Sequence, residues 1–398
     1  MDIFIIVAYL LSLLLIWQFV GYPLFMAIMS IVKKPSLKKY DFQPFVSIIV
    51  PTFNEETVIK NRIDNLLTLN YPQEKYEIII VDSGSKDKTV EIVQDKIASY
   101  PNSCPAIRLL KEEQRNGKAS AINFGKKEAI GDIILVTDAN CIFDSNVLKE
   151  LMPHFDNPQV GAVGGQYGVL NPNNNITAST QFYWDIEYLM RKGESIIDSA
   201  CTFHGEINAW RKNIVEADPR MLTEDLEMAI TIRKKGYKIV YEPGAKVYEP
   251  APSTAADQIK QRKRTSIGTI QSLFKHMGYF LLPRDIYSLV IFHSHKTLVM
   301  FSPFIMISII VLYLLSRNIY GIVLHAFVTI LIFSSLLVIL MYIRSKLRVK
   351  ETTGNFKVTS ILNIIQYVLL NEYLIMLAWK DFLFGKYSVL WEKATTTR

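Results

Sequence analysis

Charged side chains are absent from three long parts of this sequence. No Asp, Glu, Lys or Arg occurs between Ile3 and Val32, in residues 297–316 or in residues 318–343. A helix needs about 20 apolar residues to cross a bilayer core, whereas helices buried in soluble proteins rarely stay apolar beyond about 15. The pattern therefore predicts three membrane spans. Because hydrophobic residues make up 50% of the chain and charged residues only 20%, a disordered chain is excluded.

Cysteine is scarce as well. Cys104, Cys141 and Cys201 are spaced like neither a disulfide framework nor a zinc site, which is typical of a protein in a reducing compartment. Basic residues are missing before the first apolar run, which only Met1 and Asp2 precede. That run is also about twice as long as the apolar part of a signal peptide, so we expect it to remain as an anchor.

Basic residues flank the first and third runs, whereas Arg317 stands alone between the second and third. The flanking residues are Lys33, Lys34, Lys38, Lys39, Arg344, Lys346, Arg348 and Lys350. Since short loops rich in Lys and Arg stay in the cytosol, residues 33–296 are predicted to be cytosolic, in a multi-pass protein of the cell membrane. The net charge of +7 is explained by these flanks, so it indicates membrane lipids and no nucleic acid as partners.

A fourth apolar stretch begins at Val358 but reaches Glu372 after fewer than the ~17 residues that a span needs. It favours an interfacial or re-entrant helix over a fourth transmembrane helix, with a cytosolic C-terminus. Residues 267–296 mix apolar and basic side chains around Pro283, which predicts amphipathic interface helices broken there. The predicted units are an N-terminal span (1–32), a cytosolic domain (33–266), interface helices (267–296), two spans (297–343), and a basic loop with a last helix and tail (344–398).

The predicted cytosolic part alternates between strand-like and helix-like patterns. Residues 45–50, 76–81 and 132–137 are rich in Ile and Val, as in buried parallel strands. Residues 57–69 and 88–97 between them have helical patterns. This order predicts an α/β fold with a doubly wound sheet, whose ligands bind beyond the carboxyl ends of the strands. Each of the three runs is followed by polar residues at that position.

Three polar segments could carry out chemistry, although each also has a simple structural role. Asp138 and Asn140 offer oxygens to Mg²⁺ or Mn²⁺, or they form a turn. Glu224 and Asp225 could supply a general base, or they could cap the helix that follows. The basic residues 261–264 could hold a diphosphate, or they could face lipid headgroups.

Six segments together resemble the family 2 glycosyltransferases, in the order of that family. Residues 47–55 (SIIVPTFNE) and 81–89 (VDSGSKDKT) are similar to its first two strand motifs, and residues 116–123 (NGKASAIN) and 136–140 (VTDAN) follow. A Thr-Glu-Asp segment ending at Asp225 and a Gln-x-x-Arg segment ending at Arg264 complete the set. With its spans, the chain resembles the membrane-integrated hyaluronan, chitin, cellulose and poly-N-acetylglucosamine synthases, which implies a cytosolic GT-A-like domain flanked by transmembrane helices.

The resemblance also implies a reaction and residue roles. The reaction would be an inverting, metal-dependent transfer of a sugar from a nucleotide-sugar donor, expected to be a UDP-sugar, to a lipid-linked or saccharide acceptor. Mg²⁺ or Mn²⁺ would bind at Asp138 and Asn140, and Asp225 would be the catalytic base with Glu224 beside it. The donor-binding residues would be Thr52, Asn54, Glu55, Asp82, Lys118, Asp138, Gln261 and Arg264.

Three positions depart from the pattern of that family. Asn140 replaces an Asp, so a weaker amide ligand stands at the metal position. Ser83 replaces an Asp of the second strand motif, which leaves the contact to the base of the nucleotide open. Thr265 stands where the last motif normally ends in Trp, at the place where the acceptor sugar meets the donor. The last difference weakens the expectation of a processive synthase but leaves that of a transferase unchanged.

Several alternatives remain open. The chain could be a polyprenyl-phosphate glycosyltransferase, a nucleotidyltransferase, or a non-enzymatic membrane protein with a degenerate domain. Residues 161–165 (GAVGG) lack the spacing of a dinucleotide-binding loop. His204 and Gly205 could contact an acceptor or cap a loop, whereas packing is favoured for the aromatic residues Phe182, Tyr183 and Trp184.

Overall fold

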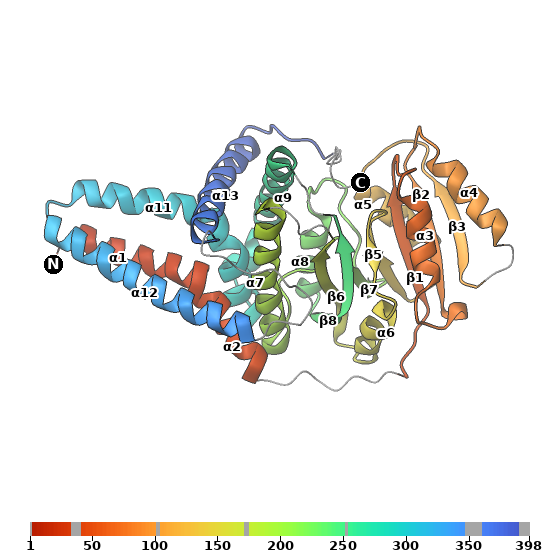
Figure 1. Ribbon diagram of the computed structural model, residues 1–398, viewed down its shortest axis with the longest axis horizontal. Helices are drawn as coiled ribbons and strands as arrows, with labels where there is room; N and C mark the ends of the chain where they lie inside the picture. Colours follow the sequence, from red (N-terminus) through yellow and green to blue (C-terminus); the bar gives the residue numbers. More distant parts are fainter. Residues whose placement is uncertain are drawn as a thin grey trace.

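The computed structural model of the protein describes residues 2–32, 41–100, 104–170, 175–250, 254–346 and 360–389. These residues form an α/β domain and a bundle of long helices that projects from it (Figure 1). Some residues named above lie outside the described part, entirely or with their side chains: Lys33, Lys34, Lys38, Lys39, Phe182, Tyr183, Arg344, Lys346, Arg348, Lys350 and Val358.

Three described helices are long and apolar enough to cross a membrane, and they confirm the candidate spans that the uncharged runs predict. They are Ile3–Val32, Tyr287–Leu315 and Ile319–Tyr342. The elements are α1 (Ile3–Ile16), η1 (Trp17–Gly21) and α2 (Tyr22–Val32), then η4 (Tyr287–Ile291), η5 (His293–Thr297) and α11 (Leu298–Leu315), then α12 (Ile319–Lys346). The second helix starts before the predicted residue 297 because its first turns, with Tyr287 and Phe292, are buried against the α/β domain.

One sheet forms the centre of the α/β domain, in the strand order β3-β2-β1-β4-β7-β6-β8-β5. The four strands at one side are parallel: β1 (Val46–Thr52), β2 (Tyr76–Asp82), β3 (Ala106–Lys111) and β4 (Ile133–Val136). The others are β5 (Ile142–Phe143), β6 (Val160–Val169), β7 (Asn208–Arg211) and β8 (Lys238–Glu249). β7 is antiparallel to both β4 and β6. The predicted α/β class is therefore confirmed, and the three predicted strands are β1, β2 and β4.

Helices cover both faces of this sheet, which explains why its strands are rich in Ile and Val on both faces. Along β1, Ile48 packs in one core with α3 (Ile59–Leu67), α4 (Thr89–Ser99) and α6 (Val147–Leu151). Its neighbour Ile49 points to the other core, with α5 (Lys118–Glu128) and α8 (Glu224–Lys234). The short 3-10 turns are η2 (Gln73–Lys75) and η3 (Met152–Asp156), and η3 packs in the core that contains Ile48.

The helix α7 (Asn175–Ile197) joins the α/β domain to the first two spans. Glu194 accepts a hydrogen bond from Tyr22 Oη at 2.6 Å, and His295 Nδ1 lies 2.6 Å from the same Glu194 oxygen. The backbones also meet closely, since a Cβ added at Gly193 would lie 2.8 Å from Met26 Cα. Polar contacts and close packing therefore hold the bundle to the domain.

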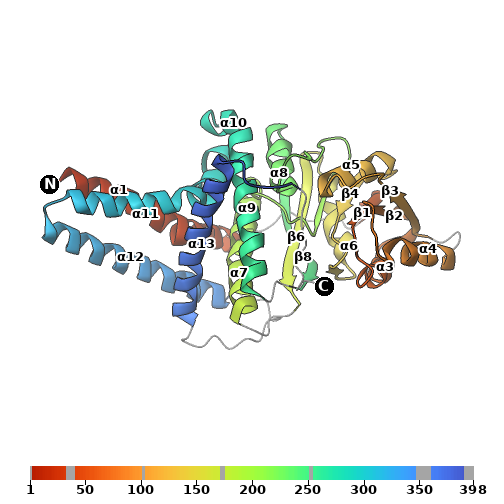
Figure 2. The same ribbon diagram turned by 90° about the horizontal axis from the view of Figure 1, so that it is seen from above.

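The remaining helices, α9 (Ala255–Lys275), α10 (Met277–Leu281) and α13 (Ser360–Leu383), lie where the domain meets the bundle. In both views α7, α9 and α13 run across the direction of the spans (Figures 1 and 2). Trp379 of α13 donates its indole N–H to the carbonyl of Met300 in α11, at 2.8 Å. Pro283 lies between α10 and the next helix, as the predicted break requires. That α13 and α10 lie in the membrane interface stays a prediction.

We expect Gly193→Ala to destabilise the protein. In an open helix Ala is more stable than Gly by about 1 kcal/mol, but here the methyl group would overlap the backbone of α2. The midpoint of thermal unfolding in detergent should therefore fall. Gly278→Ala in α10 is the control, because a Cβ there meets no atom within 4 Å, and it should not lower the midpoint. A Gly193→Ala midpoint at or above that of the unmutated protein would contradict this packing.

Candidate active site

Three carboxylates meet at the carboxyl end of β4. Oxygens of Asp138, Glu206 and Glu249 lie within 4.8 Å of one another. The strand register brings the first two together: Val136 of β4 pairs with Asn208 of antiparallel β7, so the residues two further along, Asp138 and Glu206, face each other. Glu249 comes from the end of β8, beside the start of β5.

Two neutral side chains orient Glu249. Asn140 donates its amide N–H to Glu249 Oε1 at 2.8 Å, and the hydroxyl of Tyr167 also hydrogen-bonds Glu249. Burial and the Glu249 charge raise the pKa of Tyr167 well above its ordinary value, so Tyr167 stays protonated and can donate. Asn140 therefore lies beside the acidic group with its amide nitrogen turned to a carboxylate, and its role as a metal ligand stays a prediction.

The three carboxylates fit a divalent cation. Hard ions such as Mg²⁺ and Mn²⁺ prefer carboxylate oxygens, and the ammonium of Lys118 lies beside the group. Burial and the charges of Glu249 and Asp138 raise the pKa of Glu206 to about 8. A cation at this position would relieve the repulsion that adds to the effect of burial. Asp138, Glu206 and Glu249 are thus the residues that could hold a metal.

Lys118, the first residue of α5, joins this group to a second pair of acids. Its Nζ lies 2.7 Å from Asp138 Oδ1 and 3.4 Å from Glu224 Oε1. Burial lowers the pKa of Lys118, but the charges of Asp138, Glu224 and Glu206 outweigh that effect and hold it above its ordinary value. The side chain is therefore a permanent cation between the two acidic groups.

Glu224 and Asp225 begin α8 on the other side of Lys118. Burial and the neighbouring Glu224 charge raise the pKa of Asp225, which suits a carboxylate that must take up a proton. A Cβ added at Gly205 would lie 3.3 Å from Lys118 Nζ and 4.0 Å from Asp225 Oδ2. Gly205 thus borders the space between the lysine and Asp225.

His204 and Trp184 lie beside this space but pack against other side chains. The ring of His204 is 4.6 Å from Trp184 and 5.7 Å from Tyr167, measured between ring centroids. Burial and the nearby Arg191 charge lower the pKa of His204 well below its ordinary value, so the imidazole is neutral at pH 7. Trp184 is half-buried and packs on the core, as expected.

The predicted donor-binding residues after β1 and β2 form two interlocked loops. Asn54 has a positive φ of 54°, and its Oδ1 accepts a hydrogen bond from Lys86 N at 2.8 Å. The backbone N–H of Glu55 donates to Thr89 Oγ1 at 2.7 Å. Asp82 accepts from the backbone N–H groups of Gly84 and Ser85, both at 3.1 Å, while Thr52 Oγ1 donates to the carbonyl of Val81. These residues shape the edge of the sheet next to Asp138.

Gln261 and Arg264 lie on α9. Arg264 is half-buried and Gln261 is exposed. They share a helix face with Gly268, where an added Cβ would lie 2.6 Å from Thr223 Cγ2, so that face packs beside the start of α8. Ion pairs with α13 include that between Lys263 and Asp381. The structure thus brings α9 close to Glu224 and Asp225.

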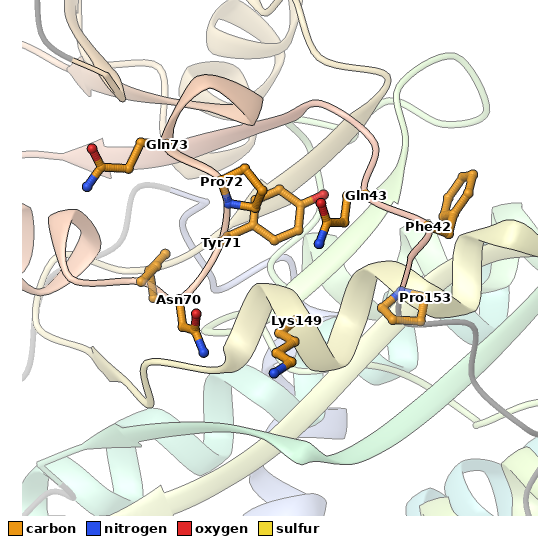
Figure 3. Close-up of a pocket in the computed structure, with 9 residues that line it drawn as sticks. Phe42, Gln43, Asn70, Tyr71, Pro72, Gln73, Lys149 and Pro153 are labelled. Atoms are coloured by element: carbon orange, nitrogen blue, oxygen red, sulfur yellow. The ribbon is translucent and has the colours of Figure 1, made fainter.

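Sequence patterns did not identify Glu206 or Glu249 as possible metal ligands. Glu206 stands in a turn before β7 and Glu249 ends a strand, and neither forms a recognisable motif with Asp138. A separate pocket of about 410 Å³ lies at the opposite edge, beside the amino ends of β1 and β2 (Figure 3). It is lined by residues such as Tyr71, Gln43 and Lys149, and by none of the predicted site residues.

Two family models match the chain. The model described as glycosyl transferase family 2 matches residues 47–217, and that described as glycosyl transferase family group 2 matches residues 133–343, more than half of the chain. Both matches include Asp138, Glu206 and the segments around them. The second continues through Glu224, Asp225 and Glu249 to the last two candidate spans.

Curated relatives are similar to this chain in sequence, and a solved structure is similar to it in fold. The poly-beta-1,6-N-acetyl-D-glucosamine synthase of Staphylococcus aureus is 28% identical over 67% of this chain, which spans 66% of that relative. The probable glycosyltransferase YdaM of Bacillus subtilis is 31% identical over 60% of the chain and 58% of its own length. The mannosyltransferase PcManGT of Pyrobaculum calidifontis, solved with GDP-Man and Mn²⁺, has the same fold, with a TM-score of 0.69 and 21% identity over 96% of this chain and 100% of that one.

Removing a carboxylate or the amide that orients one should weaken metal binding. We expect Asp138→Asn to lose most of the Mn²⁺ affinity. Asn140→Ala should lower the Mn²⁺ affinity about 10- to 100-fold, because groups that hydrogen-bond and orient a metal ligand contribute that much to the affinity. Mn²⁺ binding to the purified protein can be followed by electron paramagnetic resonance. Glu128→Gln, an acid on the far end of α5, is the control. Equal Mn²⁺ affinity in Asp138→Asn and Glu128→Gln would exclude this site.

Proposed function

We propose a reaction for this chain from the premise that it belongs to glycosyl transferase family group 2, the family whose model matches more than half of its length. The chain transfers a sugar from a nucleoside diphosphate donor to a lipid-linked or growing saccharide acceptor, with inversion at the anomeric carbon. The observation that carries the proposal is the position of Lys118, between a group of carboxylates and the Glu224–Asp225 pair. One side suits a diphosphate with its metal and the other suits an acceptor hydroxyl.

The acceptor hydroxyl oxygen attacks the anomeric carbon as the bond from that carbon to the diphosphate oxygen breaks. The bonding electrons leave with the nucleoside diphosphate, and Asp225 takes the hydroxyl proton. Lys118 stays protonated and stabilises charge on the leaving group, together with Arg264 and Gln261 of α9. Asp138, Glu206 and Glu249 would hold Mg²⁺ or Mn²⁺, which would supply further neutralisation of the diphosphate. Asn140 contributes by orienting Glu249.

The acceptor reaches the site from the membrane side. Because Gly205 has no side chain, the space between Lys118 and Asp225 stays free on its side. The nearby Trp184 belongs to α7, the helix that packs against the first two spans. Similarity to a poly-beta-1,6-N-acetyl-D-glucosamine synthase supports a saccharide acceptor. The catalytic domain faces the cytosol, where nucleotide sugars are made, and the chain spans the cell membrane with the three candidate helices.

Asp225→Asn should remove turnover but leave donor affinity within a few-fold, because a base acts on the acceptor proton. Loss of a general base costs about 10²–10⁴ in rate. Purified protein in lipid is screened with nucleotide sugars and membrane extract as acceptor, and released nucleoside diphosphate is measured, with binding followed separately. Asp64→Asn on α3, which pairs with Lys96 away from the site, is the control. A collapse of donor affinity in Asp225→Asn would make Asp225 a binding residue, and no release from any donor would refute the function.

The orientation can be tested with single cysteines in a Cys104→Ser background. Cys141 and Cys201 are buried and can remain, whereas Cys104 is exposed. Arg317 is exposed between α11 and α12, and Lys127 is exposed on α5. Each is changed to cysteine, as Arg317→Cys and Lys127→Cys. A membrane-impermeant maleimide should label position 317 in intact cells and position 127 only after permeabilisation. Labelling of both positions from the same side would overturn the cytosolic site.

A further inference from the structure

The carboxyl ends of β4, β1, β2 and β3 lie in a row, with Asp138 following the first of them. Neighbouring strands are about 4.8 Å apart, so the end of β3 is about 14 Å from that of β4. An extended nucleoside diphosphate is comparable in length to this row. With its diphosphate beside Asp138, as in the proposed function on which this inference rests, its base reaches the ends of β2 and β3.

Glu112 directly follows β3 at this place, and two hydroxyls fix its carboxylate. Ser83 Oγ donates to Glu112 Oε2 at 2.6 Å, and Ser120 Oγ donates to Glu112 Oε1 at 2.8 Å. The backbone N–H of Glu112 also donates to the carbonyl of Asp82 at 2.8 Å. A carboxylate has about four acceptor positions, so each Glu112 oxygen can accept one more hydrogen bond.

Asp82 is less suited than Glu112 to hydrogen-bond the base of a nucleotide. One of its oxygens accepts from two backbone N–H groups of its own loop and the other from Ser85 Oγ. Its side chain is buried, whereas that of Glu112 is half-buried. Asp82 therefore holds the loop, and Glu112 is the carboxylate that can face a ligand.

A flat surface lies near Glu112. The guanidinium carbon of Arg115 is 4.0 Å from the centroid of the Phe53 ring, in a cation–π contact. Phe53 follows β1 and Arg115 precedes α5, so both belong to the same edge of the sheet. Planar groups of this kind stack well with nucleobases.

We propose that Glu112 makes this site selective for a guanine nucleotide. A carboxylate only accepts hydrogen bonds, and guanine presents two adjacent donors, N1–H and N2–H₂, that match its two oxygens. Uracil presents N3–H between two carbonyl oxygens, which the negative carboxylate repels. Adenine and cytosine each combine one donor with an adjacent acceptor on this edge. The donor is therefore a GDP-sugar, in contrast to the UDP-sugar expected from the family resemblance.

The test uses the full chain in lipid nanodiscs, with GDP, UDP, ADP and CDP as probes, and calorimetry in the presence of Mn²⁺. GDP should bind most tightly. Glu112→Gln should lower the affinity for GDP by about 10- to 100-fold, the usual cost of losing a bidentate contact to a base. The same change should leave the affinity for UDP unchanged or raise it, because an amide can donate to a uracil carbonyl and accept from N3–H. The ratio of GDP to UDP affinity should therefore fall.

Glu113→Gln is the matched control, since this neighbouring acid is exposed, and it should leave the ratio unchanged. Ser120→Ala removes one hydroxyl that orients Glu112 and should reduce GDP affinity less than Glu112→Gln does. UDP binding more tightly than GDP, with a ratio unaffected by Glu112→Gln, would overturn the guanine assignment while leaving the transferase function intact. Failure of all four nucleotides to bind would instead count against the proposed function as well.

Discussion

The ion pair between Lys118 and Asp138 is the interaction on which the arrangement of the site depends. Several carboxylates gather at one edge of the sheet, and their mutual repulsion in a partly buried place costs free energy. The ammonium of Lys118 offsets part of that cost while lying close to Glu224 on its other side. Its position is set by Gly117, whose φ of +90° is a conformation that other residues rarely adopt. One cation therefore defines both halves of the site.

The sheet supplies the second constraint, through a change of strand direction between β4 and β7. In the parallel half, the loops that follow β1 and β2 meet at one edge and bind each other, as Asn54 and Lys86 do. Where β7 runs the other way, the turn before it, with Glu206, comes to the same edge. Glu206 thereby comes close to Asp138, although the two are far apart in the chain. If β7 were parallel to β4, the turn before β7 would lie at the opposite edge of the sheet.

The position of the site relative to the candidate spans follows from α7 and α9. The first packs against α2 and bonds both Tyr22 and His295 through Glu194, so the bundle and the sheet are held as one unit. The second packs beside Thr223, immediately before Glu224, and is held from its other side by α13. A proposed acceptor in the membrane would therefore meet the nucleotide edge across a short and well-packed boundary.

Local sequence patterns determined much of this protein. Uncharged runs specified the candidate spans, because a bilayer tolerates few charges. Buried strands such as β1 specified the α/β class, because helices cover both faces of the sheet. The motifs that contain Asp138 and Asp225 indicated the family. Tertiary structure alone decided which groups meet. Glu206 and Glu249 join Asp138 only through strand register, Glu112 meets Ser83 only because β3 lies beside β2, and Asn140 turns its amide to Glu249. Such contacts join residues far apart in the chain, and a sequence pattern records only neighbours.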